Sequence, residues 1–146
     1  MRLRLVALAV VAAAVVPLVA FGSAGSTSKL SAKMTGPVEV PKGAPNGHAA
    51  ASVTITGTKV CWKYTNVSGI DKPTASHIHK GKPGTAGPVV VPFGAAYKAA
   101  GCTTTTAALA KAIAANPKAY YVNIHTAKYP PGAVRGQLKA ASSSTY

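Results

Sequence analysis

Acidic residues are almost absent from this sequence. Only two of its 146 residues are Asp or Glu, against 16 Lys and Arg, and the formal net charge is +14. A pair of carboxylates is a common arrangement for acid–base catalysis, and Glu39 and Asp71 form no recognisable pair of this kind. The sequence also has no recognisable Ser/His/acid motif. We therefore expect the protein not to be an enzyme.

Arginine is also scarce. Apart from Arg2 and Arg4 near the start, Arg135 is the one arginine, and the lysines occur singly, with no block of like charge. Nucleic-acid sites gather arginine and lysine on one face, so specific nucleic-acid binding is not expected. The scattered lysines favour a solvated surface. An alternative is attraction to anionic cell-surface polymers or polysaccharides.

The N-terminal segment has the layout of a secretory signal peptide. Arg2 and Arg4 precede an apolar run over residues 5–21, and small residues follow it. We predict a signal peptide over residues 1–24 and a secreted, extracellular protein. The alternative is an uncleaved anchor, which is the one case in which we would expect contact with a membrane.

Cysteine is limited to two residues, Cys61 and Cys102, with no C-x-x-C pair. A metal site built on two thiolates is therefore disfavoured. An oxidising compartment permits a disulfide. We predict a Cys61–Cys102 disulfide. In the chain-entropy model, closing a loop of about 40 residues stabilises the folded state by about 4 kcal/mol.

The remaining chain alternates short apolar segments with Gly- and Pro-rich turns, a pattern typical of antiparallel sandwiches and barrels. One segment, 106–116, has a threonine cap, an alanine-rich body and a terminal Asn116-Pro117, which predicts a short helix. The predicted strands cover residues 29–36, 48–56, 59–67, 76–80, 88–93, 119–126 and 133–139. The sequence thus predicts an all-β, antiparallel Greek-key β-sandwich, immunoglobulin-like or superoxide-dismutase-like, with one short helix.

This domain is expected over residues 29–140, after a flexible lead at 25–28 and before a disordered tail at 141–146. Two aromatic details add to the prediction. Trp62 follows Cys61 directly, and we expect it to pack on the disulfide. The irregular alternation of the strand at 59–67 indicates a bulge or a strong twist.

Three of the four histidines fall on two predicted strands. His77 and His79 share one strand face, because side chains two residues apart point the same way. His125 shares a face with Asn123 on another strand, and Arg135 shares a face with Gln137 on a third. The opposite rows are apolar and should enter the core. If the strands are neighbours, the histidines converge, with Asn123, Arg135 and Gln137 at the margin of one polar patch.

The same segments resemble a known family. The fragments "ASHIHKGKPGTAGPVVV" and "YYVNIHTAKYPPGAVRGQL", with the earlier "LSAKMTGPVEVP", are similar to the CHRD domain, the module named after chordin. The resemblance covers nearly all of the chain after the N-terminal segment. It implies an extracellular β-sandwich, and it does not imply a particular ligand.

Three interpretations of the histidine cluster follow. The imidazoles could bond to loop carbonyls and to Asn123 and so hold the glycine-rich loop against the sheet. Alternatively, His77, His79 and His125 could bind copper or zinc, although Arg135 would repel a cation. Superoxide dismutase chemistry is a remote extension, because the chain has too few imidazoles and no suitable aspartate. In the third, Arg135 and the histidines, with Lys80 and Lys82, receive a phosphate or carboxylate.

The sequence therefore predicts a secreted CHRD-type module with a non-catalytic binding or structural role. Its alternative is an extracellular protein that binds copper or zinc through three histidines.

Overall fold

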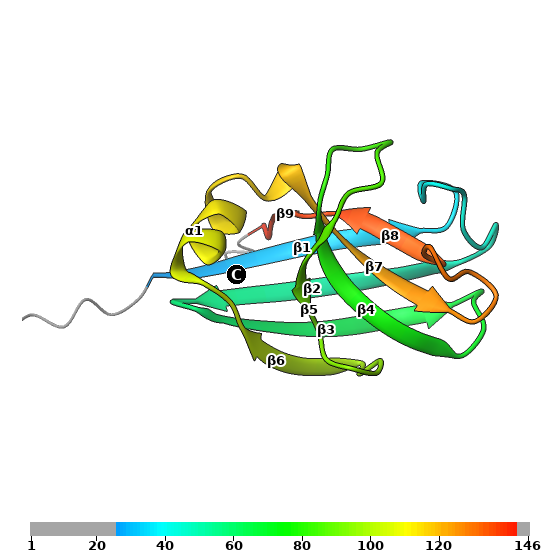
Figure 1. Cartoon of the computed structure of the whole chain (residues 1–146), viewed down its shortest axis with the longest axis horizontal. Helices are drawn as coiled ribbons and strands as arrows, with labels where there is room; N and C mark the ends of the chain where they lie inside the picture. The colour runs from blue at the N-terminus through cyan, green and yellow to red at the C-terminus, as the bar shows by residue number, and fades with distance from the viewer. Residues whose placement is uncertain (1–25, 143–146) are drawn as a thin grey trace, which may run out of the picture.

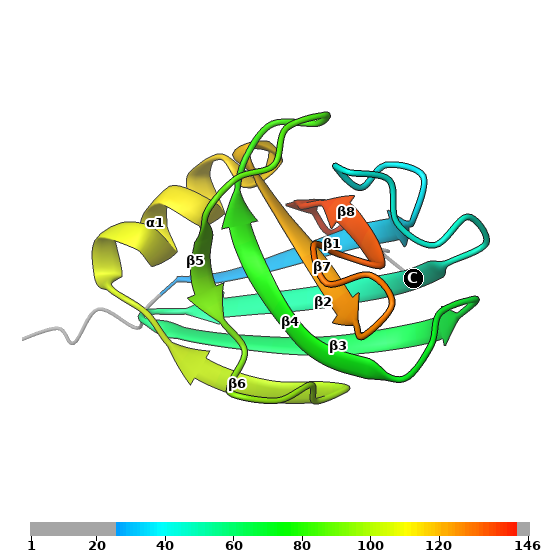
Figure 2. The same ribbon diagram turned by 45° about the vertical axis from the view of Figure 1, so that its right-hand side comes forward.

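The computed structural model describes residues 26–142. Two layers of strands cross each other, with a short helix at one end (Figure 1, Figure 2). The first layer consists of β1 (Thr27–Thr35), β2 (His48–Thr56), β3 (Lys59–Ser68) and β6 (Ala100–Thr104). The second consists of β4 (Pro73–Lys80), β5 (Val89–Pro92), β7 (Tyr120–Thr126) and β8 (Val134–Gln137). The remaining elements are α1 (Ala107–Ala115), the 3-10 helix η1 (Pro117–Ala119) and the two-residue strand β9 (Lys139–Ala140), which pairs with β1.

Both layers belong to one antiparallel sheet with the strand order β5-β4-β7-β8-β1-β2-β3-β6. The sheet folds over between β8 and β1, where Thr35 is opposite Arg135. The predicted all-β antiparallel class with one short helix is thus confirmed. The continuity of the sheet makes the sandwich almost a barrel.

The segment after β5 brings the two ends of this sheet together. The backbone N–H of Phe93 donates to Ser76 O at 3.3 Å, and that of Tyr97 donates to Thr74 O at 2.9 Å, on the β4 side. On the β3 side, Tyr64 N–H donates to Ala99 O at 2.7 Å. One stretch of chain therefore occupies both edges, which limits the backbone groups left open for pairing with another chain.

The core lies between the layers and follows the alternation of the strands. On the second layer the buried apolar side chains are those expected to enter the core: Ile78, Val122, Ile124, Val134 and Leu138, none of which is exposed to solvent. On the first layer they are Leu30, Ala32, Met34, Ala49, Ala51, Val53, Ile55, Val60, Trp62 and Tyr64. Ala110 and Ile113 of α1 add to the same cluster.

The cysteines and the tryptophan point to opposite sides of β3. Cys61 is opposite Cys102 of β6, and the two form the predicted disulfide, with their Cα atoms 4.0 Å apart. Trp62 instead stacks on Phe93 in the core, with ring centroids 4.1 Å apart, and donates to Lys98 O at 2.9 Å. The prediction that Trp62 packs on the disulfide is wrong, because neighbouring residues of a strand face opposite ways.

The element boundaries agree closely with the predicted segments. The β3 irregularity is a register shift opposite His48 and Ala50, where Asn66 has a φ of 54°. Thr106 caps α1 by accepting from Leu109 N–H at 3.2 Å. The strand β6 is not among the predicted segments.

The two ends of the domain extend further than expected. β1 begins at Thr27, which is opposite Thr56 of β2, so Thr27 and Ser28 belong to the strand and not to a lead. Ala141 N–H donates to Lys29 O at 2.9 Å. The predicted signal peptide over residues 1–24, and residues 143–146 of the predicted tail, lie outside the described residues. Within residues 26–142, no helix is long and apolar enough to cross a membrane.

Candidate functional site: a covered histidine cluster

Three histidines meet on the outer face of the second layer. His77 and His79 come from β4, and His125 comes from the adjacent β7, where Asn123 is opposite His77. One ring nitrogen from each histidine lies within 4.8 Å of the others. The structure therefore brings together the three histidines that the sequence analysis placed in one patch.

Two of these rings are fixed by backbone carbonyl groups. His79 Nδ1 lies 2.8 Å from Gly87 O, and His125 Nδ1 lies 2.7 Å from Pro130 O. A carbonyl oxygen can only accept, so each Nδ1 carries a proton and donates it. The neutral form of each ring then has its lone pair on Nε2.

Both Nε2 atoms face the side chain of Asn123. Asn123 Oδ1 lies 3.0 Å from Nε2 of His79 and 3.0 Å from Nε2 of His125. A neutral imidazole has one N–H, yet each of these rings faces two oxygen atoms. Each ring is therefore one proton short of satisfying both contacts. An ion bound at the Nε2 atoms, or an Asn123 amide turned to present its nitrogen, would remove this conflict.

Charging His79 is an unfavourable way to supply its missing proton, and His77 is also held neutral. Burial, together with smaller effects of the neighbouring His125 and His79, lowers the pKa of His77 from 6.5 to about 4. Burial also lowers the pKa of His79, against the opposing hydrogen bond to Gly87 O. At neutral pH these two rings are uncharged, which is the form that coordinates metal ions.

An aromatic and a cationic side chain flank the imidazoles. The ring of Tyr121 stacks on that of His79, with centroids 4.8 Å apart and planes 8° apart. The guanidinium carbon of Arg135 lies 4.7 Å from the centroid of the same Tyr121 ring. The Tyr121 hydroxyl accepts from Gly87 N–H at 3.1 Å. Tyr121 thus links the histidines, the glycine-rich loop and Arg135.

Arg135 joins two loops to the sheet. Its Nε donates to Val38 O at 2.6 Å, and its Nη1 donates to Thr85 O at 2.8 Å. The side chain is buried. These bonds hold Nε and Nη1, and the remaining Nη2 is buried without a partner among the described residues. Burial of the guanidinium limits its access to an external anion, which weakens the interpretation of Arg135 as part of a phosphate or carboxylate site.

A buried acid that the sequence analysis did not assign to the patch lies beside Arg135. Glu39 Oε2 is 3.9 Å from Arg135 Nε, and both side chains are buried. Burial raises the pKa of Glu39 from 4.5 to about 7, with Arg135 and the Asn123 side chain acting against this rise. When ionised, Glu39 offsets the charge of Arg135 and so reduces its repulsion of a cation. The sequence did contain one indication of a role for Glu39. It is one of only two acids in the chain, and it lies in the "VEVP" segment that resembles the family.

Gln137 lies apart from the histidines. Its Nε2 donates to Gly81 O and to Lys118 O, at 2.7 Å each. It therefore secures the start of the glycine-rich loop and η1, and it bonds to none of the imidazoles. Asn123, which was expected at the margin of the patch, lies at its centre.

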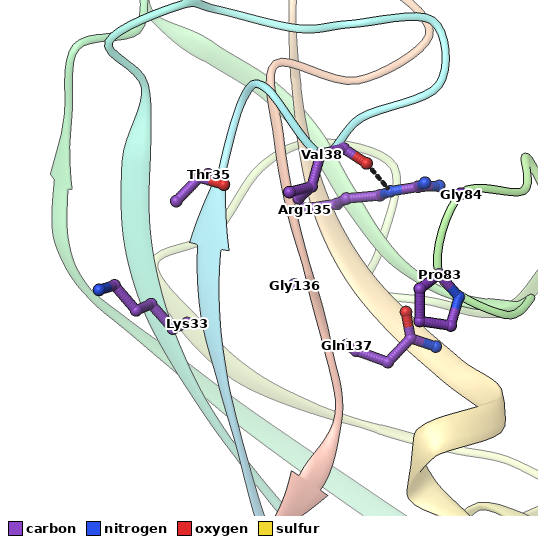
Figure 3. A pocket seen from close by; sticks show the side chains of 8 residues that line it. All are labelled: Lys33, Thr35, Val38, Pro83, Gly84, Arg135, Gly136 and Gln137. Atoms are coloured by element: carbon purple, nitrogen blue, oxygen red, sulfur yellow. Dashed lines mark hydrogen bonds between the residues drawn. The ribbon is translucent and has the colours of Figure 1, made fainter.

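A pocket of about 300 Å³ opens beside the cluster, where β1 meets β8 (Figure 3). It is lined by Lys33, Thr35, Val38, Pro83, Gly84, Arg135, Gly136 and Gln137. The side chain of Arg135 extends from β8 towards Gly84, whereas that of Lys33 projects from β1 in the opposite direction (Figure 3). The two cations therefore do not converge on one ligand in this pocket.

Comparison with known proteins identifies the family. The sequence model of the CHRD domain matches residues 30–138. The chain belongs to the CHRD-domain family. The resemblance of the histidine-bearing segments to this domain is thereby confirmed. CHRD domains are typically extracellular, and the disulfide of this CHRD-domain protein is consistent with secretion. No curated protein and no solved structure shows significant similarity to the chain.

Proposed function

We propose that this CHRD-domain protein is a secreted, non-catalytic module that binds one copper or zinc ion through His77, His79 and His125. The observation that supports this proposal is the approach of three ring nitrogens to within 4.8 Å. Tetrahedral bonds of 2.0–2.1 Å place neighbouring nitrogens about 3.3 Å apart. Metal binding therefore requires ring movements that bring the most distant nitrogens closer by up to about 1.5 Å.

The surroundings of the rings favour the same ion class. Metal-bound histidines usually donate their second N–H to a carbonyl or carboxylate, which orients the ring. The Nδ1 bonds of His79 and His125 to Gly87 O and Pro130 O match that arrangement. Imidazole nitrogens suit copper and zinc, whereas calcium and magnesium prefer oxygen ligands.

Loop support is the second candidate function. The bonds of His79 and His125 to Gly87 O and Pro130 O also tie two loops to the sheet. In this case the histidines stabilise the fold and no ion is needed. The two candidates differ in one measurable quantity, the affinity for metal.

Calorimetric titration with Zn²⁺ and with Cu²⁺ tests the proposal. We expect micromolar binding of one ion per chain, weakened at least about tenfold in His77→Ala and in His125→Ala. His77 is the safer site to change, because its ring bonds only to His125 among the described residues. The matched control is His48→Ala, since His48 is exposed and bonds to Ser68 on another part of the sheet.

The outcome decides between the candidates. No binding by the unchanged protein, with a lowered melting temperature in His125→Ala, would leave loop support as the function. An equal loss in His48→Ala would show that the ion binds elsewhere. In copper-loaded protein, superoxide should disappear no faster than in buffer alone. Faster dismutation by the loaded protein would contradict the proposal that the module is non-catalytic.

Secretion is supported by the signal-like N-terminal segment, by the disulfide and by the typical location of the family. Mass spectrometry of protein exported by its host should give a mature chain that begins near residue 25. An intact N-terminus would favour the anchor alternative.

A further inference from the structure

We propose that the outer face of β1, β2 and β3 binds a linear, carboxylate-bearing polysaccharide. This surface lies on the first layer, away from the histidine cluster, and the inference does not depend on metal binding. We call it the lysine face. It is defined by the outward side chains of Lys29, Ser31 and Lys33 on β1, Ser52, Thr54 and Thr56 on β2, and Lys59, Lys63 and Thr65 on β3.

The strand register places four of these lysines at the corners of a flat area. Lys29 is opposite Thr54, which is opposite Cys61, between Lys59 and Lys63. Two lysines four residues apart on one strand are separated by about 13 Å, and β1 and β3 are about 10 Å apart across β2. Lys139 of β9, opposite Ser31, adds a fifth cation at the edge. These lysines are far apart in the sequence, and the pairing of the strands places them on one surface.

Hydroxyl groups fill the area between the lysines. Ser52, Thr54 and Thr56 of β2 alternate with buried apolar residues and point outward. Hydroxyls donate and accept hydrogen bonds, as sugar hydroxyls do, while ammonium groups attract carboxylates. A row of small polar side chains between two rows of cations thus matches a polymer that carries both groups.

The lysines of this face have no acidic partner in the described part of the chain. The one ion pair found there joins Arg135 to Glu39 on the second layer. The other acid, Asp71, lies in the connection between β3 and β4. An anionic ligand would therefore meet cations that no internal salt bridge neutralises, and binding would break no existing pair.

Other classes of partner fit this face less well. Surface helices or loops that enter a membrane present large apolar side chains, and the exposed large hydrophobic residues, Val38 and Val89, lie outside the face. Protein interfaces are depleted in lysine. Single-stranded nucleic acids are held by aromatic stacking, and the face carries no aromatic side chain.

Titration with octagalacturonate tests the inference, with neutral maltooctaose as the ligand control. In the test variant, Lys29, Lys33, Lys59 and Lys63 are all replaced by Gln. In the matched control, Gln replaces Lys42, Lys72, Lys111 and Lys118, four exposed lysines outside the face, so that the net charge is equal. The test variant should bind octagalacturonate at least about tenfold more weakly, and the control should change less than about twofold.

A single substitution covers the case in which the fourfold variant does not fold. Thr54→Glu places one carboxylate in the middle of the face and should weaken binding by about threefold or more. His125→Ala should leave the affinity unchanged, which separates this inference from the metal proposal. Each variant is first checked for the Cys61–Cys102 bond and for a cooperative unfolding transition above the temperature of the titration.

Several results would overturn the inference. Equal weakening in the test and control variants would show attraction by net charge alone. No binding of octagalacturonate by the unchanged protein, or binding only to phosphatidylglycerol vesicles, would also exclude it.

Discussion

The two outer faces of the sheet obey the same alternation and yet have opposite surroundings. On the second layer, His79, Asn123 and Arg135 point outward and are buried. On the first layer, Lys33 and Lys63 also point outward and are exposed. Outward direction therefore does not determine exposure. The loops that fold back over the second layer determine it.

Glycines allow these loops to lie against the sheet. A Cβ atom on Gly87 would lie 1.8 Å from Lys80 O, and one on Gly43 would lie 2.3 Å from Ala133 O. No side chain fits at either distance. The loops can therefore cover the polar side chains of β4, β7 and β8, whereas no such segment within residues 26–142 covers the outer face of β1, β2 and β3.

The two faces are also stabilised differently. The covered face, which is the outer face of β4, β7 and β8, depends on hydrogen bonds between buried polar groups. Each of these groups is costly to leave unpaired. The open face, which is the outer face of β1, β2 and β3, has solvated side chains and the disulfide that joins β3 to β6. Substitutions on the two faces should consequently differ in size and in pH dependence.

The largest expected effect on stability comes from removing the disulfide on the open face. Replacing both Cys61 and Cys102 by Ala should lower the free energy of unfolding by about 4 kcal/mol, because the unfolded chain regains the entropy of an open loop. Urea unfolding of the oxidised protein and the double variant measures this difference. A loss below about 1 kcal/mol would show that pairing of β6 with β3 is secured by backbone bonds and core packing alone.

A matched pair of polar substitutions compares the faces directly. Asn123→Ala should cost about 2 kcal/mol, because it removes a fully buried amide and leaves Nε2 of the buried His79 without its one side-chain contact. Ser52→Ala should change stability by less than about 0.5 kcal/mol, because Ser52 is exposed and its contact with Lys63 O is long, at 3.4 Å. Both variants are compared by urea unfolding at pH 7.

Similar costs for the two variants would contradict the contrast between the faces. A stabilised Asn123→Ala would show that the oxygen contacts at His79 and His125 are in net conflict, as their proton count suggests.

Much of this arrangement could be predicted from the sequence. The alternation on β4 and β7 predicted that His77, His79 and His125 would converge if the two strands were neighbours, and the structure pairs these strands. The disulfide followed from the number of cysteines and an oxidising compartment. Both predictions depend on local geometry, namely the pairing of two strands and the formation of one covalent bond.

The part that could not be predicted depends on loops. Nothing in the alternation of β8 indicates that Arg135 would reach Val38 O and Thr85 O, which lie 97 and 50 residues away along the chain. Glu39 enters the same region from the loop between β1 and β2. The lysine face likewise needed the register of β1 with β2 and of β2 with β3, since only the register brings separate lysines side by side.

The smallest expected effect concerns the pH dependence of the covered face. Glu39 has a pKa raised to about 7 in the folded protein, so the folded state binds more protons than the unfolded state between pH 4.5 and 7. Its contribution to stability is present below pH 4.5 and is lost as the pH rises through 7. His77 acts in the opposite sense, because its folded pKa of about 4 lies below 6.5. Its contribution is present above pH 6.5 and is lost as the pH falls towards 4.

Between pH 4.5 and 6.5 these two effects oppose each other, so Glu39→Gln should reveal the histidine effect alone. The melting temperature of Glu39→Gln, relative to the unchanged protein, should rise as the pH increases from 5 to 8, since the amide carries no proton linkage. Thermal unfolding at a series of pH values measures this difference. Asp71→Asn is the matched control, because it removes the other acid at an exposed site, and it should show no such trend. A Glu39→Gln difference that stays constant with pH would mean that Glu39 keeps one charge state across this range, with Arg135 stabilising the carboxylate more than burial disfavours it.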